Sequence, residues 1–190
     1  RDTNLIFSVS YTTREPRGQE QDGQEYNFVS REDFVAMRDR GEFIEWAQVF
    51  DDFYGTHRRY VDQARAEGKD VVLDIDVKGA RQLRERIPEA VSVFILAPSR
   101  DELEKRLRAR GDVSEQVIRK RVAEAAREIQ DFSQYSYVLV NEQVEVASDR
   151  LQAIVESARR QQDSEQTARL RSDDAEVRTR VAQILGTFEQ

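Results

Sequence analysis

The chain has 190 residues and a formal net charge of −7, with 38% hydrophobic and 35% charged residues. This length suits one α/β core with inserted lobes better than two independent domains. The negative charge argues against a dedicated nucleic-acid binder, and no apolar run approaches the roughly 18 to 20 residues of a membrane-spanning helix. The absence of cysteine excludes disulfides and thiolate metal sites and is typical of a cytoplasmic protein. Because the net charge is negative, a phosphorylated ligand would need a local cluster of arginines.

Four short and nearly continuous apolar runs predict the strands of a parallel sheet. β-Branched residues dominate these runs, which is typical of strands buried on both faces. Helical segments separate the later runs, and this alternation predicts βαβ crossovers in a doubly wound α/β fold. The four runs are residues 5–7, 71–75, 91–96 and 137–140.

Capping residues delimit the helices that we expect around these strands. A helix over residues 77–87 ends at a proline. Ser99 begins a capping box and a helix that reaches residue 108, and Ser114 caps a longer charged helix that reaches about residue 134. After Gln161 the chain is polar, with one narrow apolar stripe that predicts a docked C-terminal helix.

Residues 11–66 have a different character, because aromatic and turn residues dominate and the apolar runs are short. Ser30 caps a helix that stops at Gly41, and short strands are expected near residues 26–29 and 43–47. We interpret this segment as a small α+β lobe inserted into the parallel core.

Two arginines emerge from a stiff loop just after the first strand. Arg14 and Arg17 flank Pro16, which fixes one backbone dihedral and favours extended geometry before it. Together with Tyr26 they could share the oxygens of a phosphate monoester, because each guanidinium offers a planar fork of donors. The alternative is two solvated surface arginines.

A further set of positions continues in unbroken order to about residue 160. Besides Arg14 and Arg17, these positions are Glu20, Tyr26 and residues 45–47, 54–56, 73–76, 106–111, 120–121 and 140–141. Together they resemble the guanylate kinase family. The resemblance implies a P-loop nucleoside-monophosphate-kinase-like parallel sheet with an inserted GMP-binding lobe and a helical lid. It implies Mg²⁺-dependent transfer of the γ-phosphoryl group of ATP to GMP, giving GDP and ADP.

Glu45 has the chemistry to select guanine. Guanine presents N1–H and its 2-amino group as adjacent donors, and one carboxylate accepts from both. Adenine has an acceptor at N1 and would leave the carboxylate unpaired, a mismatch worth roughly 10⁴-fold in binding. Taken alone, Glu45 could be a half-exposed strand residue. The resemblance implies base contacts from Ser10, Thr56 and Asp76, and phosphate contacts from Arg14, Arg17, Tyr26 and Tyr54.

Asp74 and Asp76 follow the strand near residue 71, at the sheet edge where ligands bind in open α/β folds. Strand-end aspartates near a phosphate site commonly hold Mg²⁺ or its waters. The resemblance places Asp74 on the magnesium side, acting indirectly, and Asp76 on the guanine side. A helix N-cap role for one of them remains open. Lys78 departs from the family, where glutamine usually fills this position.

Arg106 and Arg110 lie four residues apart on one expected helix, so both project from the same face. The resemblance implies that they and Arg121, on the next helix, belong to a lid and reach the phosphates being transferred. We therefore assign catalysis to Arg106, Arg110, Arg121 and Asp74, and ATP contacts to Arg106, Arg110 and Asn141. The alternative for the arginines is a solvated charged helix.

The glycine-rich loop that should cradle the ATP phosphates is absent from this sequence. The only Gly-Lys pair is Gly68-Lys69, which is followed by an aspartate. We therefore expect the chain to be a fragment that lacks the family's first strand, P-loop and first helix and is inactive by itself. The alternative is a catalytically silent guanylate-kinase-like module that binds GMP or a phosphopeptide.

These interpretations divide the chain into four expected parts, and they leave its oligomeric state undetermined. The parts are a core of residues 1–10, 67–105 and 126–162, a GMP-binding lobe of residues 11–66, a lid of residues 106–125 and a tail of residues 163–190.

Overall fold

The structure is a computed structural model that describes residues 2–109 and 114–189. It divides into two compact units, of which the first ends at Ala90 and the second begins at Val91. None of the helices in the described ranges has both the length and the apolar character needed to cross a membrane.

A parallel strand pair in the first unit confirms two of the predicted strands. β1 (Leu5–Phe7) pairs in parallel with β6 (Asp70–Val72). The chain reaches β6 through α2 (Arg59–Glu67), which ends at Gly68 with a positive φ of 62°. This left-handed conformation favours glycine at a helix end, so the Gly68-Lys69 pair belongs to a helix C-terminus. β6 ends earlier than expected because the following residues lead into the next helix.

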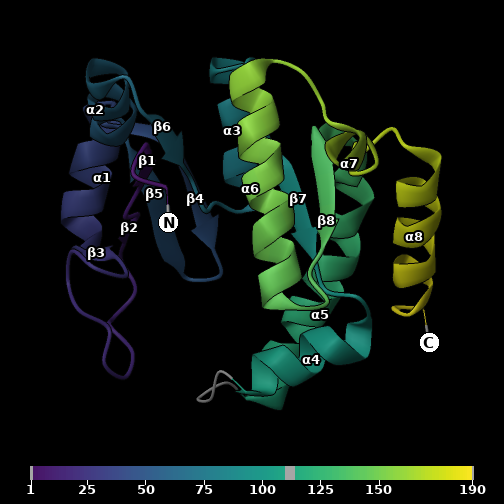
Figure 1. Cartoon of the computed structure of the whole chain (residues 1–190). Helices are drawn as coiled ribbons and strands as arrows, with labels where there is room; N and C mark the ends of the chain where they lie inside the picture. The colour runs from purple at the N-terminus through teal and green to yellow at the C-terminus, as the bar shows by residue number, and fades with distance from the viewer. Residues whose placement is uncertain (1, 110–113, 190) are drawn as a thin grey trace. The chain divides into compact units, whose positions relative to one another are not determined.

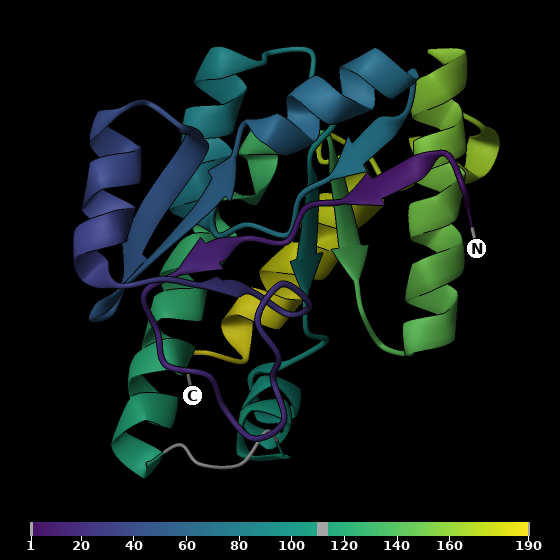
Figure 2. The ribbon, with the colours of Figure 1, turned by 90° about the vertical axis from the view of Figure 1, so that its left-hand side faces the viewer.

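The predicted α+β lobe contains a four-stranded sheet in the order β3-β2-β5-β4. Helix α1 (Arg31–Asp39) begins at its N-cap Ser30, whose hydroxyl accepts from the Asp33 amide at 3.0 Å, and flanks this sheet (Figure 2). Helix α3 (Val77–Arg86) packs against β4, which lies at the sheet edge. The strands are β2 (Tyr11–Thr12), β3 (Asn27–Phe28), β4 (Phe43–Val49) and β5 (Asp52–His57).

Stacked aromatic rings form the core between α1 and this sheet. Phe34 is fully buried, and its ring centroid lies 4.5 Å from that of Phe43 and 5.4 Å from that of Phe53. Trp46 packs against the same cluster, as expected for a core residue. These rings bury the apolar face of α1 and hold the β4–β5 hairpin in place.

The second unit contains the other predicted parallel pair, β7 (Val93–Leu96) and β8 (Tyr137–Val140). Helix α6 (Val144–Arg160) lies along this pair in Figure 1. The predicted caps are confirmed, since the Ser99 hydroxyl accepts from the Glu102 amide at 3.2 Å and that of Ser114 from the Val117 amide at 3.3 Å. The intervening elements are α4 (Arg100–Ala109), α5 (Glu115–Glu128) and the 3₁₀ helix η1 (Ile129–Gln134).

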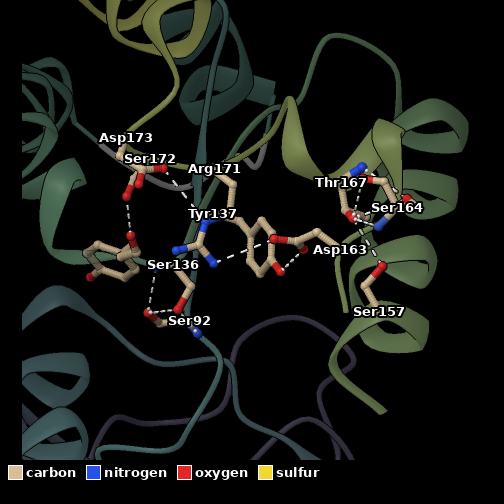
Figure 3. A network of polar contacts seen from close by, with 11 residues as sticks. Ser92, Ser136, Tyr137, Ser157, Asp163, Ser164, Thr167, Arg171, Ser172 and Asp173 are labelled. Atoms are coloured by element: carbon tan, nitrogen blue, oxygen red, sulfur yellow. Dashed lines mark hydrogen bonds and ion pairs between the residues drawn. The ribbon is translucent and has the colours of Figure 1, made fainter. Parts of the chain in front are cut away.

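The C-terminal segment adds a short strand-like stretch to the β8 edge, which the sequence did not predict. The Val138 amide donates to the Leu170 carbonyl at 2.8 Å, and the Ser172 amide donates to the Ser136 carbonyl at 3.2 Å. Figure 3 shows side chains that reinforce this contact: the Tyr137 hydroxyl bonds to Asp163, and Arg171 lies over the Tyr137 ring. The remaining helices are α7 (Glu165–Ala168) and α8 (Ala175–Gly186), the second of which is the predicted C-terminal helix.

Replacing Phe34 with alanine should destabilise the first unit by about 3–5 kcal/mol, because a buried ring is lost and a cavity is left among its neighbours. Urea unfolding followed by fluorescence checks this, since the single tryptophan, Trp46, packs against the same cluster. Phe34→Leu, which keeps more of the volume, should cost roughly half as much. Equal stability of the wild type and Phe34→Ala would contradict this description of the core.

Candidate functional site

The first group of predicted site residues surrounds the Arg14 guanidinium. Arg14 is only 8% exposed, and it donates to the Glu15 carbonyl at 2.7 Å and to Glu20 Oε1 at 2.9 Å. Its guanidinium carbon lies 5.3 Å from the centre of the Tyr26 ring, which in turn contacts Tyr54 edge-on at 5.9 Å. The structure thus brings Arg14, Tyr26 and Tyr54 together.

Glu20 organises the loop that carries both arginines. Its second oxygen accepts from the Arg17 amide at 2.8 Å, so one carboxylate joins the Arg17 backbone to the Arg14 side chain. Burial works to raise the pKa of Glu20, but the hydrogen bonds from Arg17 and Arg14 prevail and lower it. The sequence reasoning included Glu20 in the family resemblance but gave it no role. The Arg17 residue itself is exposed.

The second group surrounds the Glu45 carboxylate. Glu45 on β4 pairs across the sheet with Thr56 on β5, and the two are 3% and 0% exposed. Burial raises the pKa of Glu45, and the nearby Asp76 charge adds to the rise. Contacts with Thr56 lower it by a smaller amount, although the Thr56 hydroxyl has no partner in hydrogen-bonding geometry among the described residues. The buried Glu45 carboxylate can therefore accept hydrogen bonds from a ligand, and the buried Thr56 hydroxyl beside it can donate or accept one.

The start of α3 lies directly against this carboxylate. Asp76 is the N-cap of α3, and its side chain accepts from the Gly79 amide at 2.7 Å, so the capping alternative is confirmed for this residue. A Cβ atom placed on Gly79 would lie 2.3 Å from Glu45 Oε2, a separation that real atoms do not adopt. The sequence reasoning missed Gly79, for which a glycine in the first turn of a helix was the available signal.

Asp74 and Ser10 lie at the margins of these groups. Asp74 is exposed, and its charge contributes to the raised pKa of Tyr26, after burial and the influence of Tyr54. The Ser10 residue is half-buried, and its carbonyl accepts from the Asn27 amide at 2.8 Å. Within the described ranges, no group of three or more potential metal-ligating side chains occurs, so Asp74 would have to act on a metal together with other oxygens.

The second unit contains the remaining predicted residues. Arg106 on α4 donates to Glu102 Oε1 at 2.8 Å and to the Asn141 carbonyl at 2.9 Å, which brings two predicted residues together. The Asn141 side-chain oxygen is buried without a hydrogen-bond partner in the part of the chain that the structure describes. Arg121 lies on α5 and is half-buried. Arg110 falls outside the described residues.

Comparisons with known proteins show which family the chain resembles. The family model described as guanylate kinase matches residues 1–158. A guanylate kinase of Koribacter versatilis is 52% identical over 165 residues, covering 85% of this chain and 71% of the relative. A guanylate kinase of Vibrio cholerae is 48% identical over 161 residues, covering 85% and 78%. The crystal structure of guanylate kinase from Anaplasma phagocytophilum superposes with a TM-score of 0.71 at 34% identity, covering 95% of this chain and 85% of that one.

Replacing Glu45 with glutamine should stabilise the ligand-free protein at neutral pH. Because the pKa of Glu45 is raised in the folded state, the folded chain binds more protons than the unfolded chain between the ordinary value of 4.5 and the raised one. The unfolding free energy of the wild type therefore falls as the pH increases through this interval, and Glu45→Gln removes that fall. Urea unfolding between pH 4 and pH 8 measures the difference.

Glu42→Gln is the matched control, and its effect should have the opposite sign. The hydrogen bond from Arg40 lowers the pKa of Glu42, so its contribution to stability is present at neutral pH and is lost as the pH falls. If Glu45→Gln destabilised the protein at pH 7 as Glu42→Gln is expected to, the burial argument for Glu45 would be wrong.

Proposed function

The chain belongs to the guanylate kinase family, and from this premise we propose which of its residues recognise GMP and support phosphoryl transfer from ATP. Guanylate kinases transfer the γ-phosphoryl group of ATP to GMP, so we assign the chain as an ATP:GMP phosphotransferase. Because the matched relatives are guanylate kinases, we favour the enzyme over the silent binding module.

Glu45 is proposed to select guanine, and its burial is the observation that carries this assignment. A carboxylate that is 3% exposed loses hydration, so it favours a ligand that offers two donors together. Guanine N1–H and the 2-amino group provide that pair. Thr56, whose buried hydroxyl has no hydrogen-bond partner among the described residues, is proposed as a further base contact, as are Asp76 and Ser10.

Arg14 is proposed to hold the GMP phosphate with Arg17, Tyr26 and Tyr54. Support comes from the loop geometry, because Glu20 and the Glu15 carbonyl fix the Arg14 guanidinium before a ligand arrives. A fixed guanidinium loses little conformational entropy on binding, so its charge contributes more to affinity than that of a free side chain.

Asp74 is proposed to act on the magnesium side through water or the nucleotide phosphates. Its carboxylate follows β6 and is exposed, which suits a hard cation that keeps several waters. When bound, Mg²⁺ would neutralise negative charge on the phosphates. The part of Asp74 would be to hold the ion indirectly, by accepting hydrogen bonds from its waters.

Arg106 is proposed to stabilise the charge that develops on the transferred phosphoryl group, together with Arg110 and Arg121. Phosphoryl transfer depends mainly on positioning and positive charge, because the protein forms no covalent bond to the group. Glu102 and the Asn141 carbonyl orient the Arg106 guanidinium. Asn141 is proposed to lie near adenine. We expect the protein to act in the cytoplasm on these small-molecule substrates.

The isosteric change Glu45→Gln tests the guanine assignment, because it replaces one acceptor oxygen with a donor facing guanine's own donors. GMP affinity measured by calorimetry should fall about 10²-fold. Glu42→Gln, which changes the residue just before β4, should bind GMP like the wild type. AMP should bind weakly to all three proteins. Unchanged GMP affinity in Glu45→Gln would overturn the assignment.

The change Arg106→Ala tests the lid assignment. In a form of the protein that carries the family's P-loop, the turnover number kcat should fall on the order of 10³-fold with little change in KM for GMP, because the lost charge acts on the transferred group. Lys105→Ala on the same helix, whose side chain is 79% exposed, provides the control. A steady-state coupled assay measures both variants. A kcat of Arg106→Ala equal to that of Lys105→Ala would argue that Arg106 only stabilises its helix.

A further inference from the structure

The edge of β4 is closed by side chains of α3 instead of another strand. β4 is the terminal strand of its sheet, so the outward-facing N–H and C=O groups of every second residue have no strand partner among the described residues. The Gln82 carboxamide donates to the Trp46 carbonyl at 2.6 Å and accepts from the Trp46 amide at 3.4 Å. One side chain thereby imitates the peptide group of a neighbouring strand.

The same relationship extends one turn of α3 in each direction. Lys78 donates to the Gln48 carbonyl at 3.1 Å, and Arg86 donates to the Ile44 carbonyl. The three donors are four residues apart on the helix, a rise of about 6 Å. Their acceptors are two residues apart on the strand, a distance of about 6.8 Å. The near match lets Lys78, Gln82 and Arg86 form a ladder that holds α3 in register with β4.

A glycine of α3 lies against the Glu45 carboxylate. Glu45 itself lies between the rungs at Ile44 and Trp46, and its side chain reaches Gly79, which has no side chain to occupy the space. A Cβ on Gly79 would lie 2.3 Å from Glu45 Oε2 and 3.0 Å from Glu45 Cδ, and both are atoms at the flexible end of that side chain. A methyl group here would therefore displace the carboxylate rather than the helix.

We propose that α3 is the positioning element for guanine recognition. The ladder of Lys78, Gln82 and Arg86 fixes the position of β4 along α3, and Gly79, which has no side chain, leaves room for the Glu45 carboxylate. This inference rests on the proposed role of Glu45. Gly79 and Gln82 are positioning residues, because they act through the carboxylate. They determine whether its two oxygens can meet two adjacent donors at once.

The variant Gly79→Ala tests this proposal. Calorimetry should show GMP affinity reduced about tenfold or more, as expected when a buried charged acceptor is displaced from its donors. The midpoint of urea unfolding should change little, because the displaced group is the end of a side chain. Gly186→Ala, a helical glycine with no atom within 4 Å of its added Cβ, is the matched control and should bind GMP normally.

A double-mutant cycle with Glu45→Ala distinguishes positioning from general damage. If Gly79 acts through the carboxylate, Gly79→Ala should have no further effect in the Glu45→Ala background. An equal effect in both backgrounds, or normal GMP affinity in Gly79→Ala, overturns the inference while leaving the role of Glu45 intact. Normal GMP affinity in Glu45→Ala alone overturns the proposed function itself.

Gln82→Leu provides an independent test that also decides the matter if Gly79→Ala does not fold. It removes both hydrogen bonds to Trp46 while keeping the side-chain volume. We expect a 3- to 10-fold loss of GMP affinity that disappears in the Glu45→Ala background. Gln63→Leu on α2, where the glutamine contacts only Glu67 among the described residues, is the control. Normal GMP affinity in Gln82→Leu would overturn the ladder's role.

Discussion

The burial of the Glu45 carboxylate between the edge strand β4 and the start of α3 is the constraint around which the first unit is organised. Glu45 loses hydration at a position that is 3% exposed, which favours its protonated form and opposes folding in its charged form. A ligand with two adjacent donors would remove that cost, so under the role proposed for Glu45 the desolvation that weakens the free protein would strengthen discrimination between purines. Stability and selectivity would then be opposed at this residue.

One short helix connects the parts of the candidate site in the first unit. α3 begins at Asp76, two residues after Asp74, and its first turn contacts Glu45. Its later turns bond to the backbone of β4, the strand that carries Glu45. The acidic groups assigned to the base thus meet at the start of one helix, and Asp74 lies two residues before its N-cap.

The sequence predicted most of the strands and the caps, because these depend on local apolar runs and on hydroxyl side chains at helix starts. It did not predict β2, β5 or the pairing of residues 170–172 with β8. β2 and residues 170–172 are defined by pairing with segments that are distant in the sequence. The candidate residues came from the family resemblance and the chemistry of Glu45. Gly79 and Gln82 could not be identified, because their importance arises from the register of α3 on β4, which sequence spacing alone does not encode.

The anchoring of the C-terminal segment has a consequence for self-association. Residues 170–172 occupy one edge of β8, and Tyr137 with Arg171 and Asp163 fastens them there (Figure 3). An open strand edge is a template on which another molecule can add a strand of its own. Loss of this anchor would expose the backbone on this side of β8 to intermolecular strand addition.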